Sequence, residues 1–188
     1  MTRIIAGRAG GIRLDVPSAG TRPTSDRVRE SLFGALEAGG ELDDAAVLDL
    51  YAGSGALGLE ALSRGARSAD LVERAAGAAQ VARGNAARVA AACTGASARV
   101  HRAAVAAFLA VARGPYDLVF ADPPYAVGDD ETAAMLAALV PHLGPDALVV
   151  LERGARAGAP AATPGLEQER TKRYGDTVLW WLRATGTP

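Results

Sequence analysis

Four consecutive residues, Asp122-Pro123-Pro124-Tyr125, carry the clearest chemical signal in the sequence. They directly follow the apolar run 116–121, which predicts a strand. An exocyclic amine on an aromatic ring is a poor nucleophile, because its lone pair is delocalised into the ring. The Asp122 carboxylate and the Pro123 carbonyl offer two acceptors for the N–H groups of such an amine. The two prolines fix φ and hold the loop rigid, and Tyr125 offers a flat face for stacking a base.

A second segment, Gly53-Ser54-Gly55-Ala56-Leu57-Gly58, lies between an apolar run and a helical pattern. Glycines there allow a tight turn, close approach of a ligand to the backbone, and close packing of the helix on the strand. Glu73 ends the next predicted strand, where an acidic side chain can accept hydrogen bonds from two ribose hydroxyls. Together these features predict a site for a cofactor that contains adenosine. A tight structural turn without a ligand is the alternative.

Asp49 lies four residues before Gly53, near the end of the same strand. A carboxylate at that place suits a ligand with a cationic ammonium group and a sulfonium, and it would repel a pyrophosphate. Residues 49–55 resemble the first motif of S-adenosylmethionine-dependent methyltransferases. Residues 122–125 resemble the Asp/Asn-Pro-Pro-Tyr/Phe motif of amino-directed nucleic-acid methyltransferases. An Asp at a strand end is sometimes only a cap. The assignment therefore rests on two segments together, residues 53–58, called the glycine loop below, and residues 122–125, called the catalytic loop below.

The N-terminal residues narrow the resemblance. Residues 3–7, 11–14, 16–17 and 22–33 resemble the RsmD family, which methylates the N2 amine of one guanine in bacterial 16S ribosomal RNA. The tetrapeptide Tyr-Gly-Asp-Thr at 174–177 falls in family order too, so the resemblance covers essentially the whole chain. It implies S-adenosylmethionine as cofactor, and 16S ribosomal RNA or the small ribosomal subunit as partner.

The resemblance also implies three sets of site residues. The catalytic residues are Asp122, Pro123, Pro124 and Tyr125. The cofactor-binding residues are Asp49, Tyr51, Ala52, Gly53, Ser54, Gly55, Gly58, Glu73, Arg74, Ala104 and Val105. The residues expected to contact RNA are Arg3, Arg8, Arg13, Arg22, Thr24 and Arg27, and no metal ligand is implied. One position departs from the family, because relatives often carry Asp or Asn where Ala104 stands. The adenine would then rely on backbone groups near Ala104 and Val105 and on apolar packing.

Alternating strand and helix patterns from residue 45 onward predict the elements that position these residues. We expect strands at 47–51, 69–73, 98–101, 116–121 and 147–151, and helices at 56–64, 75–91, 104–112 and 130–140. Continuous apolar strands alternating with helices indicate a parallel sheet covered on both faces. Residues 167–174 and 177–182 predict a terminal antiparallel hairpin. The expected fold is therefore α/β: a doubly wound, seven-stranded, mostly parallel sheet of the class I methyltransferase, Rossmann-like type.

The first part of the chain predicts a smaller unit. Residues 3–16 read as a β-hairpin with its turn at 7–11. A helix follows, with Thr24 or Ser25 as N-cap and an apolar stripe of Val28, Leu32 and Leu36. We therefore expect an N-terminal extension, residues 1–23, that contacts RNA or the ribosome, and a methyltransferase domain, residues 24–188.

Composition sets limits on partners and chemistry. The 188 residues include 20 Lys and Arg against 21 Asp and Glu, so the formal net charge is −1. Residues 1–33 hold six Arg against three acidic residues, a local excess of +3 that favours a polyanionic partner at this end. One cysteine excludes an intramolecular disulfide and a zinc site of several thiolates, and two histidines leave little for metal chemistry. Without a signal peptide or an apolar run of membrane length, we expect a cytoplasmic protein that is not in a membrane. We also expect a monomer that binds no metal.

Other functions remain open from the sequence. The same tetrapeptide serves DNA adenine-N6 and cytosine-N4 methyltransferases, although the chain has no separate target-recognition domain. A non-catalytic ribosome-assembly factor could keep the fold, but the intact Asp122 and glycine loop argue against it. A nicotinamide dehydrogenase is disfavoured, since no catalytic Tyr-Lys or His-Asp pair stands out.

Overall fold

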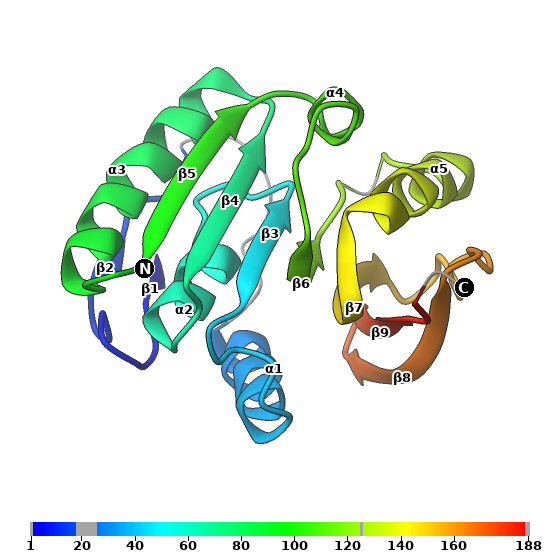
Figure 1. Ribbon diagram of the computed structural model, residues 1–188, viewed down its shortest axis with the longest axis horizontal. Coiled ribbons are helices and arrows are strands. Elements are labelled where there is room, and N and C mark those ends of the chain that lie inside the picture. Colours follow the sequence, from blue (N-terminus) through cyan, green and yellow to red (C-terminus); the bar gives the residue numbers. More distant parts are fainter. Residues whose placement is uncertain (1, 18–25, 125, 187–188) are drawn as a thin grey trace.

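The computed structural model describes residues 2–17, 26–124 and 126–186. Its main sheet consists of β3 (Ala46–Leu50), β4 (Ser68–Glu73), β5 (Ser97–Arg102), β6 (Tyr116–Ala121), β7 (Leu143–Gly154), β8 (Leu166–Tyr174) and β9 (Thr177–Ala184). The strand order is β5-β4-β3-β6-β7-β9-β8 (Figure 1). The first five strands in this order are parallel, and β9 is antiparallel to both of its neighbours. The predicted α/β sheet with its terminal antiparallel hairpin is confirmed.

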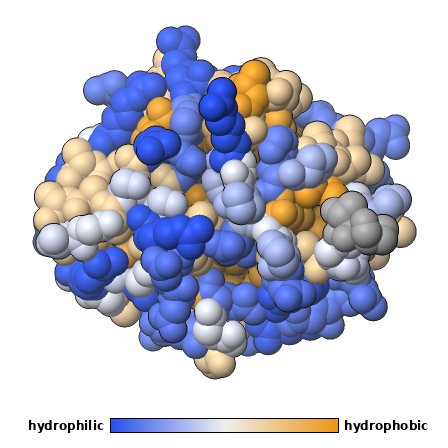
Figure 2. Space-filling model, in the orientation of Figure 1, coloured by the Kyte–Doolittle hydropathy of each residue, from blue (hydrophilic) through white to orange (hydrophobic). Residues whose placement is uncertain are grey.

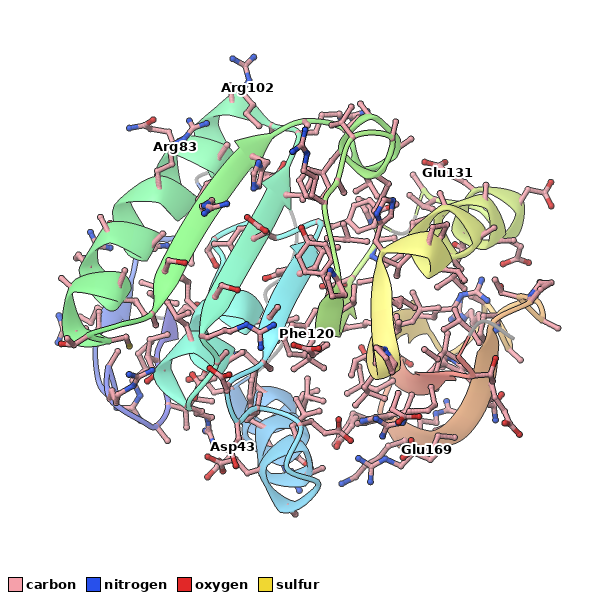
Figure 3. All side chains as sticks on the ribbon, viewed as in Figure 1. Asp43, Arg83, Arg102, Phe120, Glu131 and Glu169 are labelled. Carbon is pink, nitrogen blue, oxygen red and sulfur yellow. The ribbon has the colours of Figure 1, made fainter. Side chains whose placement is uncertain are left out.

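Helices cover both faces of the sheet. They are α1 (Asp26–Ala38), α2 (Ala56–Ser63), α3 (Ala76–Ala92), α4 (Val105–Leu109), α5 (Asp129–Leu139) and the 3-10 turn η1 (Val140–His142). Side chains alternate between faces along each strand, so Val47 and Phe120 pack toward α1, α2 and α3, while Leu48 and Val119 pack toward α4 and α5. Phe33 of α1 lies against Phe120, with ring centroids 5.7 Å apart. Figure 3 shows Phe120 in the middle of the sheet.

The N-terminal hairpin is present, but its strands are short. β1 (Thr2–Arg3) and β2 (Arg13–Leu14) pair antiparallel over two residues each. The segment between them is held by polar side chains of α2 instead of a longer ladder. The buried Glu60 carboxylate accepts hydrogen bonds from the Ile5 and Ala6 amides at 2.7 and 3.1 Å. The apolar side chains of the hairpin, Ile4, Ala9 and Leu14, belong to the same core as α1, α2 and α3.

Two elements, α4 and β7, differ most in length from the sequence prediction. Helix α4 ends at Leu109 instead of residue 112, and Val111 beyond it is 75% exposed, so no apolar burial stabilises a further turn. Strand β7 begins at Leu143 and continues to Gly154, because its last residues pair with β9 as far as Thr177. The apolar pattern marked only the middle of β7, since Glu152 and Arg153 interrupt it.

The stripe expected on the first helix is largely confirmed. Leu32 and Leu36 are fully buried, Phe33 joins them, and Val28 packs at the edge of the core. The expected N-cap residues, Thr24 and Ser25, lie outside the described residues. Hydrophilic residues cover most of the face shown in Figure 2, with apolar patches between them. Across residues 2–17, 26–124 and 126–186, no helix is long and apolar enough to cross a membrane.

Candidate functional site

The glycine loop leaves the carboxyl end of β3 through residues with positive φ. Tyr51 has φ 64°, Gly53 has φ 56° and Gly55 has φ 82°, and Gly55 is the N-cap residue of α2. A non-glycine residue in the left-handed region is uncommon and is often found at functional sites. The Ala52 amide donates to the Val72 carbonyl at 2.9 Å, which ties the loop to the end of β4.

Close packing of α2 on the sheet depends on Gly58. A Cβ at this position would lie 2.4 Å from Leu71 Cδ2 and 3.2 Å from Asp49 Cβ. The Gly58 amide donates to Asp49 Oδ2 at 2.9 Å. A Cβ at Gly55 would lie 3.0 Å from the Leu71 side chain and 3.1 Å from the Leu59 side chain, so this position faces the core. Its positive φ is a second reason for glycine, because other residues rarely adopt that conformation.

Asp49 is a buried carboxyl group, only 2% exposed. Burial raises its pKa to about 7, the Gly58 hydrogen bond lowers it, and the charge of Glu73 raises it again. A buried carboxyl with a raised pKa is stabilised as the carboxylate when a cation approaches it. This property matches a ligand that carries a positive charge.

Glu73, at the end of β4, organises the backbone around it. Its Oε2 accepts from the Gly53 amide at 3.0 Å, and its Oε1 accepts from the Ala75 amide at 2.6 Å. The carboxylate thus joins the glycine loop to the start of α3, while Arg74 beside it is exposed. A carboxylate offers about four lone-pair sites, so two backbone bonds leave acceptor capacity for a ligand.

The turn before α4 lies next to Glu73. The Ala103 amide donates to the Glu73 carbonyl at 3.2 Å, and Ala104 is the N-cap residue of α4. Ala104 is exposed and Val105 is partly buried. The structure therefore places Ala104 and Val105 at the same edge of the sheet as the glycine loop and Glu73.

The register of the sheet brings Asp122 to this edge as well. Ala121 of β6 pairs with Leu50 of β3 on one side and with Leu151 of β7 on the other. The next residue, Asp122, therefore follows directly at the carboxyl edge, beside Glu152 of β7. Pro123 is partly buried and Pro124 is exposed, and Tyr125 lies outside the described residues.

Asp122 experiences the charges of its neighbours. Burial raises its pKa to about 8, and the negative charges of Glu152 and Asp49 contribute to this rise. Asp122 can therefore accept a hydrogen bond as the carboxylate or hold a proton, depending on what approaches it near neutral pH.

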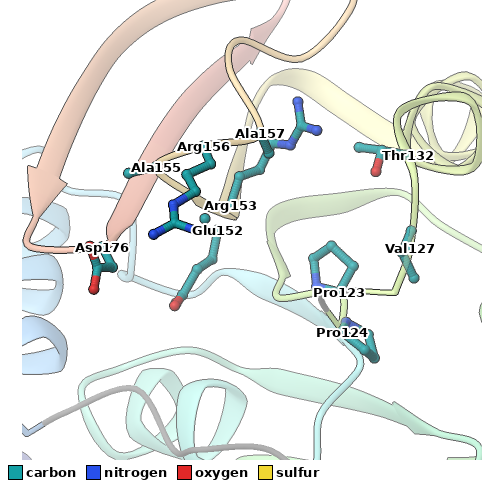
Figure 4. A pocket seen from close by; sticks show the side chains of 11 residues that line it. Pro123, Pro124, Val127, Thr132, Glu152, Arg153, Ala155, Arg156, Ala157 and Asp176 are labelled. Carbon is teal, nitrogen blue, oxygen red and sulfur yellow. The ribbon is translucent and has the colours of Figure 1, made fainter.

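A pocket of about 490 Å³ opens beside Pro123 and Pro124. Such a volume is typical of small-molecule sites. Figure 4 shows Pro123, Pro124 and Val127 on one side of it, and Glu152, Arg156 and Asp176 on the other. The remaining lining residues are Thr132, Arg153, Gly154, Ala155 and Ala157.

The arginines expected to contact RNA lie in different environments. Arg3 and Arg13 are directly opposite each other on β1 and β2, and both are exposed. Arg27 is exposed in the first turn of α1. Arg8 instead donates to the carbonyls of Leu62 and Thr94 at 3.3 and 3.1 Å, near the ends of α2 and α3.

Those two carbonyls precede β4 and β5, so Arg8 lies at the edge of the sheet opposite to the glycine loop. Its guanidinium caps helix ends there, a structural contact that the charge pattern alone did not predict. The structure therefore does not bring Arg8 together with Asp49, Glu73 and Asp122. Arg22 and Thr24 lie outside the described residues.

The sequence interpretation missed two residues near the carboxyl edge of the sheet, where the glycine loop lies. Glu152 reaches the pocket because β7 extends further than its apolar core. Asn85 of α3 is fully buried, and its Nδ2 donates to the carbonyls of Ser54 and Asp15 at 2.8 and 2.9 Å. Asn85 thus links the N-terminal segment to the glycine loop. Glu152 had a signal in the sequence, since like Asp122 it follows an apolar run at a strand end.

Within the described part of the chain, no group of three or more His, Cys, Asp or Glu side chains could hold a metal ion.

Comparisons with known proteins show the family of the chain. The family model described as conserved hypothetical protein 95 matches residues 2–183. Ribosomal RNA small subunit methyltransferase D of Escherichia coli K12 is 40% identical over 177 residues, covering 94% of this chain and 86% of that protein. The protein of the same name from Haemophilus influenzae is 37% identical over 153 residues, covering 80% of this chain and 77% of its own.

Solved structures show the same fold. The Escherichia coli protein yhhF is 35% identical, with a TM-score of 0.83 and 97% of each chain covered. TrmN from Thermus thermophilus, at 20% identity, shares the fold alone, with a TM-score of 0.63 over 84% of this chain and 48% of TrmN. The fold is that of the class I methyltransferases. The family match and the identity over nearly the whole chain show that the chain belongs to the conserved hypothetical protein 95 family, the family of the RsmD ribosomal RNA methyltransferases.

Proposed function

We propose that this chain transfers a methyl group from S-adenosylmethionine to the exocyclic N2 amine of a guanine in 16S ribosomal RNA. The observation that carries the proposal is the position of Asp122 and Pro123 directly after β6, next to the buried Asp49 at the carboxyl edge of the sheet. Ligands of open parallel sheets bind at this edge. The relatives named ribosomal RNA small subunit methyltransferase D support the choice of substrate.

The residues at the edge fit S-adenosylmethionine. The glycine loop and Glu73 would hold the ribose, with Glu73 accepting hydrogen bonds from its hydroxyls. Asp49, buried and with a raised pKa, would face the positive charge of the methionine part. Backbone groups around Ala104 and Val105 would border the adenine. Tyr51, Ala52, Ser54 and Arg74 complete the loop ends around this site. When bound, the cofactor supplies an electrophilic methyl group.

The catalytic loop prepares the amine that receives this methyl group. The Asp122 carboxylate and the Pro123 carbonyl accept hydrogen bonds from the two amine hydrogens and draw the nitrogen toward tetrahedral geometry. The prolines keep these acceptors in place, and Tyr125 would stack on the base. The methylated nitrogen is briefly cationic and strongly acidic, so one of its protons passes to the Asp122 carboxylate and then to water.

The same proposal includes the partner and the organisation of the chain. Residues 1–23 would form the extension that contacts RNA in the assembled or assembling small subunit, and residues 24–188 would form the methyltransferase domain. Arg3, Arg8, Arg13 and Arg27 are the exposed described members of the RNA-binding set, and the Arg8 guanidinium is already bound to backbone carbonyls. We further infer a monomer that acts in the cytoplasm, where ribosomal subunits are assembled in bacteria.

A methyl-transfer assay tests this function. Purified protein and tritium-labelled S-adenosylmethionine are offered free 16S RNA, undermethylated small subunits and DNA in parallel. The expected result is label in the ribosomal RNA, in one or both of its forms. Label in DNA alone, or in none of the three, would contradict the proposal.

A further inference from the structure

Two carboxyl groups, those of Asp122 and Glu152, follow neighbouring strands at the carboxyl edge of the sheet, and Glu152 lines the pocket. The pairing of Ala121 with Leu151 makes Asp122 and Glu152 the next residues of neighbouring parallel strands, on the same face of the sheet. Glu152 lines the pocket together with Pro123 and Pro124 of the catalytic loop. Figure 4 shows its side chain extending from β7 on the side of the pocket opposite the two prolines.

Hydrogen-bond donors between the two carboxyl groups would make this arrangement more favourable. Two neighbouring carboxylates repel each other, and the charge of Glu152 contributes to the raised pKa of Asp122. A ligand that presents N–H groups to both carboxyls removes the conflict, whereas a ligand that presents an acceptor to either one increases it. The pocket is therefore suited to a ligand edge with adjacent hydrogen-bond donors.

Among the nucleobases, guanine has such an edge. Its Watson–Crick side carries the N1–H donor next to the N2 amine, which has two N–H donors. Adenine and cytosine present an unprotonated ring nitrogen, an acceptor, next to their exocyclic amines. Arg156 lines the same side of the pocket as Glu152, and its guanidinium is the kind of donor that the adjacent O6 acceptor of guanine requires.

We propose that Glu152 determines the base specificity of the reaction by accepting a hydrogen bond from N1–H of the target guanine while Asp122 engages its N2 amine. This inference rests on the proposed function and goes beyond it, because it assigns the choice of guanine to a residue outside the catalytic tetrapeptide.

A structural role for Glu152 makes a different prediction. Thr177 Oγ1 donates to Glu152 Oε1 across the β7–β9 pair at 3.4 Å, a long hydrogen bond. If Glu152 served only this pairing, Thr177→Val would change activity in the same way as a substitution of Glu152. If Glu152 accepts a hydrogen bond from guanine N1–H, Thr177→Val leaves the preference for guanine as it is in the wild type.

The test compares guanine with 2-aminopurine at the methylated position. 2-Aminopurine keeps the N2 amine but has an unprotonated N1 and no O6, so it removes both the donor assigned to Glu152 and the acceptor that faces Arg156. Once the modified position has been mapped, 16S RNA carrying either base there is made by ligation and assembled into small subunits. Methyl transfer is then measured as kcat/KM for each base with the wild type, Glu152→Gln and Thr177→Val. Glu167→Gln, which removes the same charge from an exposed position on β8, is the matched control.

We expect the wild type, Thr177→Val and Glu167→Gln to favour guanine over 2-aminopurine by about 10- to 100-fold, the effect of losing one hydrogen bond to a charged group. Glu152→Gln can donate to the unprotonated N1, so its preference for guanine should fall about 10-fold or more below that of the wild type, and only the part that depends on O6 should remain. Thermal unfolding of each variant checks the fold. If Glu152→Gln is unstable, Glu152→Asp keeps the carboxylate and should keep the preference for guanine at a lower rate.

The outcomes separate this inference from the proposed function. A wild type that prefers guanine, together with a Glu152→Gln variant that keeps the full preference, would overturn the role of Glu152 and leave the proposed function intact. A wild type that methylates neither base would overturn both.

Discussion

At the scale of single residues, the site is a row of acidic side chains. Asp49, Glu73, Asp122 and Glu152 lie at or near the carboxyl ends of four neighbouring strands. The strand registers place all four on the face of the sheet that α1, α2 and α3 cover. A concentration of negative charge of this kind favours a cationic cofactor and a substrate that donates hydrogen bonds, and it disfavours the pyrophosphate of a dinucleotide.

Replacing Asp122 by Asn should reduce methyl transfer strongly. An amide can still accept one hydrogen bond, but it has no charge to stabilise the positive nitrogen and cannot take up its proton. The expected loss is about 10²–10³ in kcat, typical of removing one electrostatic partner at the reacting atoms. Single-turnover rates with cofactor in excess measure this, and unchanged affinity for S-adenosylmethionine is the control. A rate within threefold of wild type would remove Asp122 from the mechanism.

Replacing Asp49 by Asn should make the protein more stable at neutral pH and should weaken its binding of S-adenosylmethionine. The folded protein holds the Asp49 proton up to a pKa of about 7, against an ordinary value of 3.8, so it binds more protons than the unfolded chain between these limits. The stabilising contribution of Asp49 is therefore present below about pH 4 and is lost as the pH rises toward 7. The amide side chain of the Asp49→Asn variant does not titrate, and its oxygen can still accept from the Gly58 amide.

The Tm difference between Asp49→Asn and the wild type should consequently grow in favour of the variant from pH 5 to pH 8, while affinity for S-adenosylmethionine falls. Thermal unfolding at both pH values and titration calorimetry measure these two effects. A Tm difference independent of pH would show that Asp49 is not the titrating group.

At the scale of elements, the contact between α2 and the sheet holds the glycine loop in place. Gly58→Ala would put a methyl group 2.4 Å from Leu71 Cδ2 and close to Asp49. We expect a loss of about 1–3 kcal/mol in the free energy of unfolding, from overpacking, together with weaker cofactor binding. Chemical denaturation measures the loss.

Gly84→Ala on α3 is the matched control for this substitution. A Cβ there would meet only Arg88 Nη1, at 4.0 Å. This change should stabilise the protein by about 0.5–1 kcal/mol, because alanine is the better helix former. Equal effects of the two substitutions would contradict the packing role assigned to Gly58.

The order and type of the elements could be predicted from the sequence because they depend on local patterns. β6 was predicted with its observed bounds, and α2 and α3 within one residue at each end. The candidate site residues in the glycine loop and in residues 122–125 were predicted for the same reason. Glu152 was not, although it follows an apolar run, because only the strand register shows that it lies beside Asp122. Asn85 was not, because its importance depends on contacts between segments far apart in the chain. Arg8 could not be distinguished from Arg3 and Arg13, since charge alone does not show which guanidinium is bound to backbone carbonyls.

At the scale of the whole molecule, the N-terminal segment is joined to the core and is placed to present charge. Glu60, Ser63 and Asn85 bind its backbone. Arg3 and Arg13 remain exposed on neighbouring strands, where their like charges oppose each other. A polyanion that bridges both arginines would relieve this repulsion.

Replacing Arg3 and Arg13 together by Ala should weaken binding to the small subunit and leave cofactor affinity unchanged. Each lost phosphate contact should flatten the slope of log K against log salt concentration by about 0.7–0.9. Binding titrations at several salt concentrations measure the slope, with Arg83→Ala, an exposed position on α3, as the control. A double variant with the slope and affinity of the wild type would place the RNA on another surface, such as that around Arg170, Lys172 and Arg173.

The identity of the methylated nucleoside tests the central claim most directly. Undermethylated small subunits are incubated with S-adenosylmethionine and either the wild type or Asp122→Asn, and the RNA is digested and analysed by mass spectrometry. The account predicts one additional N2-methylguanosine per 16S RNA with the wild type, and a strongly reduced rate of its formation with Asp122→Asn. N6-methyladenosine, a methyl group on ring carbon, or equally fast formation with both proteins would contradict it.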